Sequence, residues 1–137
     1  MPHALSFAQP TSVRRSRSGV IALWIVQIAL AGMFLLAGGS KLLGVPAMVT
    51  LFNIIGVGQW FRYVTGIVEV GSAIALLVPS IAVFGALALV PTMIGAVATE
   101  LFIVGDSAVP PAVLLLGALG VVWARRHQLL SALPLAR

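Results

Sequence analysis

Cysteine is absent from the 137-residue chain, which excludes disulfides, thiolate metal sites, Cys-x-x-Cys redox chemistry and covalently attached haem. Histidine is scarce as well, because the chain has only His3 and His127, and both lie outside the long apolar segments. The paired histidines that would hold a b-type haem inside a membrane are therefore missing. If the protein takes part in electron transfer, another subunit or a diffusible quinone has to carry the electron.

Charged residues are also few. They make up 8% of the chain, and apolar residues make up 61%. A soluble domain has about a quarter charged residues and about half apolar ones. The composition therefore places the chain in a lipid bilayer, and the length leaves room for one compact membrane domain.

The basic residues are concentrated near the two ends of the sequence. A net charge of +5 would indicate a nucleic-acid partner only if the basic side chains formed a stripe on a soluble face. Six of the eight instead lie in the terminal regions: Arg14, Arg15, Arg17, Arg125, Arg126 and Arg137. The positive-inside rule accounts for this distribution without nucleic acid. We therefore expect a multi-pass protein of a bacterial-type cytoplasmic (inner) membrane, with both termini cytoplasmic.

Four apolar segments predict an all-α fold, a polytopic membrane protein built as a four-transmembrane-helix bundle. The uncharged stretch at 20–39 favours a retained first helix over a cleaved signal peptide, because it is long enough to cross the bilayer. Residues 63–104 are about twice as long as one span, and Pro79-Ser80 breaks them into two helices. The predicted organisation is a mobile basic tail at 1–19, a membrane domain at 20–126 with helices at about 20–40, 61–78, 81–104 and 108–125, and a C-terminal tail at 127–137.

The connector at 42–60 is the one long loop that the pattern predicts. Gly44, Pro46 and Asn53 are residues that interrupt helices and favour turns. The apolar content of this connector indicates that it lies along the membrane interface. At the end of the fourth helix, we expect Arg125 and Arg126 to extend their head groups to water.

Ionisable residues inside the predicted helices are the first candidates for a functional site. Glu69 and Glu100 fall in the outer halves of the second and third helices, and a carboxylate at that depth costs several kcal/mol. Arg62, Thr65, Glu69 and Ser72 recur at helical spacing and form one polar stripe that should face the bundle interior. Lys41 is the expected partner of Glu69, with Arg62 as the alternative.

The cluster Lys41, Arg62, Glu69 and Glu100 has three interpretations. The charges form an ionic brace, since structural ion-pair networks also place charges inside proteins. Alternatively they line an outward-facing pocket for a head group, a quinone or a proton, or they contact a partner subunit.

Other polar and small residues in the helices have simpler interpretations. Gln27 is expected to donate a hydrogen bond between helices, and Pro91 to kink the third helix. Six glycines are expected at close helix contacts: Gly66, Gly71, Gly85, Gly95, Gly117 and Gly120.

Over about residues 22–126 the sequence resembles the DoxX-like family of small four-helix membrane proteins. The resemblance rests on four runs in order, AGGSKL at 37–42, GQWFRYVTGIVEVG at 58–71, LLVP at 76–79 and MIGA at 93–96. Many relatives carry a histidine at the position of Glu100, so a histidine-based mechanism is not carried over. The resemblance implies functional roles for Lys41, Arg62 and Glu69 alone.

The resemblance also implies a function, because some relatives resemble subunits of thiosulfate:quinone oxidoreductase and others are linked to membrane oxidoreductase complexes. We therefore expect an accessory or quinone-interacting subunit of such a complex. The expected cofactor is a quinone, with no covalently bound cofactor and no metal. A small proton-coupled transporter and a purely structural assembly subunit are the alternatives. The expected partners are the lipid bilayer, membrane or peripheral redox subunits and further copies of the chain.

Overall fold

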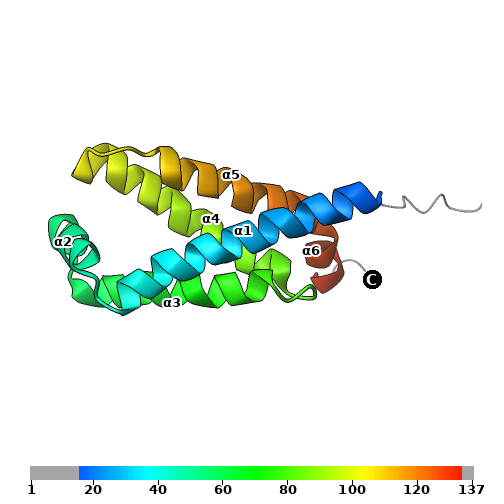
Figure 1. The fold of residues 1–137 in the computed structure, drawn as a ribbon, viewed down its shortest axis with the longest axis horizontal. Coiled ribbons are helices and arrows are strands. Elements are labelled where there is room, and N and C mark those ends of the chain that lie inside the picture. Colours follow the sequence, from blue (N-terminus) through cyan, green and yellow to red (C-terminus); the bar gives the residue numbers. More distant parts are fainter. Residues whose placement is uncertain (1–15, 134–137) are drawn as a thin grey trace, which may run out of the picture.

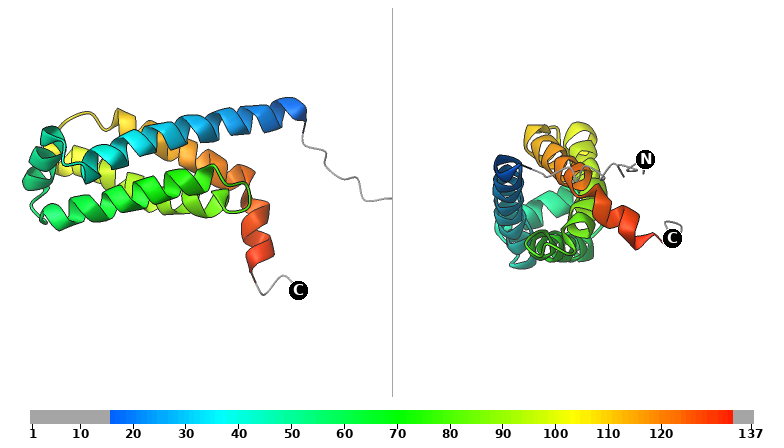
Figure 2. Two further views of the ribbon diagram at one scale, coloured as in Figure 1. Left: turned by 60° about the horizontal axis from the view of Figure 1, so that its bottom comes forward. Right: turned by 90° about the vertical axis from the view of Figure 1, so that its right-hand side faces the viewer.

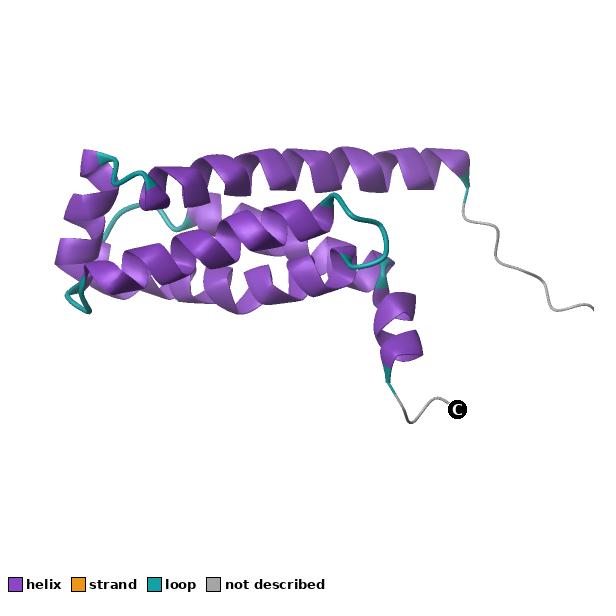
Figure 3. Ribbon diagram, turned by 90° about the horizontal axis from the view of Figure 1, so that it is seen from below, coloured by secondary structure: helices purple, strands orange, loops and turns teal. Residues whose placement is uncertain are grey.

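The computed structural model describes residues 16–133, which are all-α and contain no strand (Figure 3). The helices are α1 (Arg17–Leu42), α2 (Pro46–Ile55), α3 (Gln59–Leu76), α4 (Ala82–Thr99), the π-helical turn η1 (Glu100–Val104), α5 (Val109–Ala124) and α6 (Arg126–Ala132). The predicted all-α fold is confirmed. Residues 1–15 of the predicted tail at 1–19 and residues 134–137 of the predicted tail at 127–137, with Arg14, Arg15 and Arg137, lie outside the described residues.

The long helices α1, α3, α4 and α5 lie side by side, and α2 crosses one end of them (Figures 1 and 2). α1 packs against α3, α3 against α4, α4 against α5, and α5 back against α1. α6 lies at the opposite end, where α1 begins, so the described chain starts and finishes at the same end of the bundle. The buried apolar core consists of Leu30, Ala31, Phe34, Ala73, Leu76, Ala86, Leu89, Met93, Ala118 and Val121.

Two segments, Arg17–Leu42 and Ala82–Val104, are long and apolar enough to cross a membrane. A third is obtained if α5 and α6, which meet at a bend of 56°, are counted as one span. α3 is not among them, because Gln59, Arg62 and Glu69 lower the hydropathy of its 18 residues. Length and composition therefore support two or three spans, whereas the sequence pattern predicts four.

The expectation of a loop at 42–60 is wrong, because ten of these residues form α2. Pro46 occupies the first turn of this helix, where a missing N–H is tolerated. Gly56 ends the helix with a φ of +79°, and its N–H donates to the Phe52 carbonyl. The proline and the glycine therefore mark the two ends of a helix rather than positions within a loop.

Both predicted tails overlap helices: residues 17–19 belong to α1, and residues 127–132 belong to α6. Ser16 Oγ accepts a hydrogen bond from the N–H of Gly19 at 3.2 Å, so this cap starts α1 at Arg17 rather than at residue 20. Residues predicted as the C-terminal tail form α6. Gln128 fixes α6 to the α3–α4 turn, because its side chain donates to the Pro79 carbonyl and accepts from the N–H of Val83 at 3.3 Å.

Arg125 does not extend to water as predicted, although the neighbouring Arg126 is exposed. Arg125 is 8% exposed, and its Nε donates to Gln27 Oε1 at 2.7 Å. Gln27 in turn donates to the Leu76 carbonyl at 2.6 Å, as expected of an interhelical amide. This chain of hydrogen bonds joins α1, α3 and the end of α5, and it satisfies polar groups that lipid cannot hydrate.

The glycine prediction is half right. Built Cβ atoms at Gly66, Gly85 and Gly117 would meet atoms of neighbouring helices at 3.1 Å or less, whereas those at Gly71, Gly95 and Gly120 would meet nothing within 4 Å. Periodicity alone does not say which faces of a membrane helix touch a neighbour.

Candidate functional site

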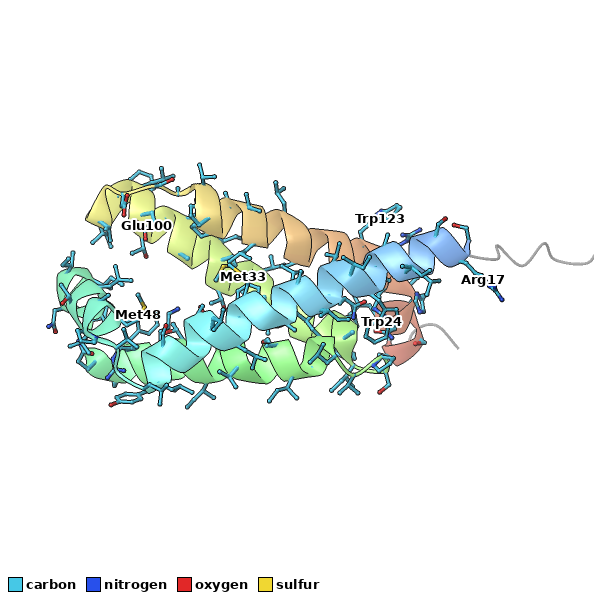
Figure 4. The ribbon with its side chains drawn as sticks, in the orientation of Figure 1. Arg17, Trp24, Met33, Met48, Glu100 and Trp123 are labelled. Atoms are coloured by element: carbon cyan, nitrogen blue, oxygen red, sulfur yellow. The ribbon has the colours of Figure 1, made fainter. Side chains whose placement is uncertain are left out.

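A cavity of about 580 Å³ lies at the end of the bundle that α2 covers. Its wall is mostly apolar and aromatic, with residues such as Phe34 of α1, Phe52 of α2 and Met93 of α4. Met48 and Glu100, which both line it, appear at this end in Figure 4. The polar residues on the wall are Ser40, Lys41, Thr65, Glu69, Thr92, Thr99 and Glu100. This size, with a few polar groups on an apolar wall, is typical of small-molecule sites.

The predicted ion pair between Lys41 and Glu69 is confirmed and lies on this wall. Lys41 Nζ donates to the two carboxylate oxygens of Glu69 at 2.9 and 3.2 Å. The Lys41 side chain is 14% exposed and that of Glu69 is 3% exposed. Because both charges are largely removed from solvent, each depends on the other for compensation.

Two glycines allow α1 and α3 to approach closely beside this ion pair. A Cβ on Gly38 would lie 2.8 Å from Val70 Cγ2 and 2.9 Å from the Gly66 carbonyl oxygen. No side chain separates the two backbones at this point, as is common between membrane helices. Lys41 and Glu69 each follow one of these glycines by three residues, so the helix contact sets their separation.

Arg62 does not serve as the alternative partner of Glu69. Its Nε donates to Gln59 Oε1 at 2.7 Å, its Nη1 donates to the Lys41 carbonyl, and its guanidinium carbon lies 4.3 Å from the ring centroid of Tyr63. Arg62 therefore joins the start of α3 to the end of α1 beside the ion pair. Gln59 extends this network to α2, because its Nε2 donates to the Val49 carbonyl at 3.0 Å.

The polar stripe on α3 faces the bundle interior as predicted. Arg62, Glu69 and Ser72 are buried, and Thr65 is partly buried. Residues on the opposite side of the same helix, including Ile67 and Ile74, are apolar and exposed. The helix thus separates a polar inner face from an apolar outer face.

Glu100 lies on the cavity wall at the start of η1. The π-helical turn closes at Gly105, whose φ of +76° directs its N–H to the Glu100 carbonyl at 2.8 Å. Within residues 16–133, Glu100 Oε2 is the buried side-chain polar atom that has no hydrogen-bond partner. Single π-helical turns often occur at functional sites, and a buried acceptor without a partner calls for an explanation.

The structure therefore brings the four predicted charges to one end of the bundle without joining them in one ionic cluster. Lys41 and Glu69 form an ion pair, and Arg62 adjoins it through the Lys41 backbone. Glu100 lies on the wall of the same cavity, and its buried Oε2 has no hydrogen-bond partner. Across the described part of the chain, no group of three or more His, Cys, Asp or Glu side chains is arranged to hold a metal ion.

Sequence reasoning missed the contribution of α2 and of the start of α5 to the wall. Met48, Leu51, Phe52 and Ile55 come from α2, and Pro110 and Pro111 come from the first turn of α5. The signal for α2 was the apolar content of residues 42–60, which predicts a segment at the membrane interface and does not by itself indicate a cavity wall.

The sequence profile of the DoxX-like family matches residues 25–125, which extend from α1 to the end of α5 and include Lys41, Arg62, Glu69 and Glu100. No curated protein and no solved structure matches the chain.

Proposed function

The chain belongs to the DoxX-like family, and from this premise we propose that it is a four-span membrane protein that binds a molecule of the quinone pool for a membrane oxidoreductase complex. The proposal assigns quinone binding to this chain and electron transfer to a partner subunit. This division of roles agrees with the lack of cysteine in the sequence.

The observation that carries the proposal is the cavity at the α2 end. Its aromatic and aliphatic wall suits the ring and tail of a lipophilic molecule, and its few polar groups suit a head group. The wall also contains a buried ion pair and the unpartnered oxygen of Glu100. A simple gap in apolar packing would not contain such polar groups.

The packing of the four long helices supports four spans with both termini in the cytoplasm. α3 has a lower hydropathy than the others, but its charged residues point inward and its outer face is apolar. A helix of this kind presents only apolar side chains to lipid when it is packed in a bundle. Both ends of the described chain lie at one end of the bundle, where Arg17, Arg125 and Arg126 also lie, as the positive-inside rule requires of a cytoplasmic face.

Filling the cavity tests the proposal. Gly95 lines the cavity, and a Cβ added there meets nothing within 4 Å, so Gly95→Leu adds volume to the wall without an immediate clash. Gly120→Leu is the matched control, because Gly120 also has open space around it but lies on α5 away from the cavity. In lipid nanodiscs, a decyl-substituted benzoquinone or benzohydroquinone should bind the unmodified protein and Gly120→Leu, and should bind Gly95→Leu at least tenfold more weakly.

Other outcomes of this experiment favour the alternatives. Equal binding by both leucine variants, or no saturable binding by any protein, contradicts quinone binding in the cavity. Proton-coupled uptake of a solute by reconstituted vesicles would favour a transporter. Neither binding nor transport by correctly folded protein would favour a structural assembly subunit.

A further inference from the structure

The hydroxyl groups on the cavity wall already donate hydrogen bonds within the protein. Each donates to a backbone carbonyl of its own helix three or four residues earlier: Ser40 to Ala37 at 2.8 Å, Thr65 to Phe61 at 3.0 Å, Thr92 to Ala88 at 2.9 Å and Thr99 to Gly95 at 2.8 Å. A hydroxyl has one proton and two lone pairs. These four side chains therefore offer a ligand lone pairs, not protons.

The start of α5, which also lines the cavity, offers no donor either. The first turn of a helix normally leaves its N–H groups free. Here Pro110 and Pro111 have no N–H, the N–H of Val109 bonds to Ser107 Oγ at 3.3 Å, and that of Ala112 bonds to the Ala108 carbonyl at 3.0 Å. The N-terminus of α5 therefore has no free N–H group here to donate to a ligand acceptor.

The charged groups on the wall also offer few free hydrogen-bond donors. The ammonium group of Lys41 is the one side-chain donor of the wall within residues 16–133 beyond the hydroxyls. It already contacts both oxygens of Glu69, and the Ala37 carbonyl lies 3.5 Å away. Glu100 adds two carboxyl oxygens, of which Oε2 is buried and has no hydrogen-bond partner. The wall is therefore rich in acceptors and poor in free donors.

We propose that the cavity discriminates between the two redox forms of its ligand and binds the hydroquinone in preference to the quinone. This inference rests on the proposed function and specifies which redox form of the quinone-pool molecule the cavity binds. A hydroquinone brings two hydroxyl donors, and one of them satisfies Glu100 Oε2. A quinone carries only carbonyl acceptors, which find few donors on the wall and leave Glu100 unpaired. A site whose buried acceptors are left unpaired rejects the ligand that lacks donors.

Three matched probes test the preference under anaerobic conditions. They are a decyl-substituted benzohydroquinone, the corresponding benzoquinone and the dimethyl ether of the hydroquinone, which keeps the shape and lacks the donors. Isothermal titration into the full-length protein in nanodiscs, with empty nanodiscs subtracted, should show that the hydroquinone binds about tenfold more tightly than the other two.

Two variants test whether the preference for hydroquinone depends on Glu100. Glu100→Gln replaces one carboxyl oxygen by an NH2 group, which donates and cannot accept, so the ratio between hydroquinone and quinone affinities should fall at least threefold. Asp106→Asn is the control, because Asp106 is an exposed acidic residue in the turn before α5. It should keep the full preference.

The outcomes separate this inference from the proposed function. Saturable binding with equal affinities, or with the quinone favoured, overturns the hydroquinone preference and leaves quinone-pool binding intact. An unchanged ratio in Glu100→Gln overturns the role of Glu100. Absence of saturable binding for all three probes overturns both proposals.

Discussion

At the scale of single residues, the Lys41–Glu69 ion pair links the stability of the protein to its cavity. The two charges are held at 2.9 Å on the cavity wall, largely shielded from solvent. A buried charge that loses its partner destabilises a protein much more than the loss of the whole pair, because only the first leaves an uncompensated charge. Substitutions at these positions therefore separate an ionic brace from a binding site.

We predict that Glu69→Gln lowers the free energy of unfolding by about 3–5 kcal/mol, because it leaves Lys41 without a counter-charge. The double variant Lys41→Met with Glu69→Met should recover most of this loss, since it removes both charges and keeps similar volumes. Unfolding in detergent, followed by circular dichroism, measures both effects. A stable double variant that still binds the quinone-pool molecule at full affinity would assign the pair to bracing alone.

At the scale of helices, the contact between α1 and α3 decides where the ion pair lies. Gly38 and Gly39 are adjacent on α1 and differ sharply in their surroundings. A Cβ at Gly38 meets three atoms of α3 at 2.8–3.0 Å, whereas a Cβ at Gly39 meets nothing within 4 Å. Substitutions at these two positions therefore separate the effect of helix packing on stability from the effect of helix propensity.

We predict opposite effects of alanine at these two positions. Gly38→Ala should lower the free energy of unfolding by about 1–3 kcal/mol, because α1 and α3 have to move apart. Gly39→Ala should leave stability unchanged or raise it by up to about 1 kcal/mol, because alanine favours the helix. Unfolding midpoints of the two variants in the same detergent give the comparison. Equal destabilisation by both would contradict the packing seen between α1 and α3.

At the scale of the whole molecule, two polar networks lie at opposite ends of the bundle. Gln27 and Arg125 join helices at the end where the described chain starts and finishes, and the ion pair and the cavity lie at the α2 end. The proposed orientation in the membrane places the first end in the cytoplasm and the cavity near the outer face.

We predict that reporter fusions follow this orientation. Alkaline phosphatase fused after Arg137 should be inactive, because the C-terminus stays in the cytoplasm, and the same enzyme inserted between α2 and α3 should be active. A fluorescent protein that folds only in the cytoplasm provides the reciprocal measurement. Phosphatase activity at the C-terminus would contradict four spans with both termini inside.

The sequence by itself determined that the chain is helical, because uncharged runs interrupted by proline, glycine and charge leave few other structures for a membrane chain. It also determined the inner face of α3, because helical spacing places Arg62, Glu69 and Ser72 on one stripe. It named Lys41 as the partner of Glu69 but left Arg62 as the alternative, and only the structure decided between them. Only the tertiary structure decided that α2 forms a cavity wall, that Gln27 binds Arg125, and that Glu100 Oε2 lacks a partner. The physical reason is that periodicity reports the face of a helix on which a residue lies, whereas a cavity and its hydrogen bonds depend on how faces distant in sequence meet.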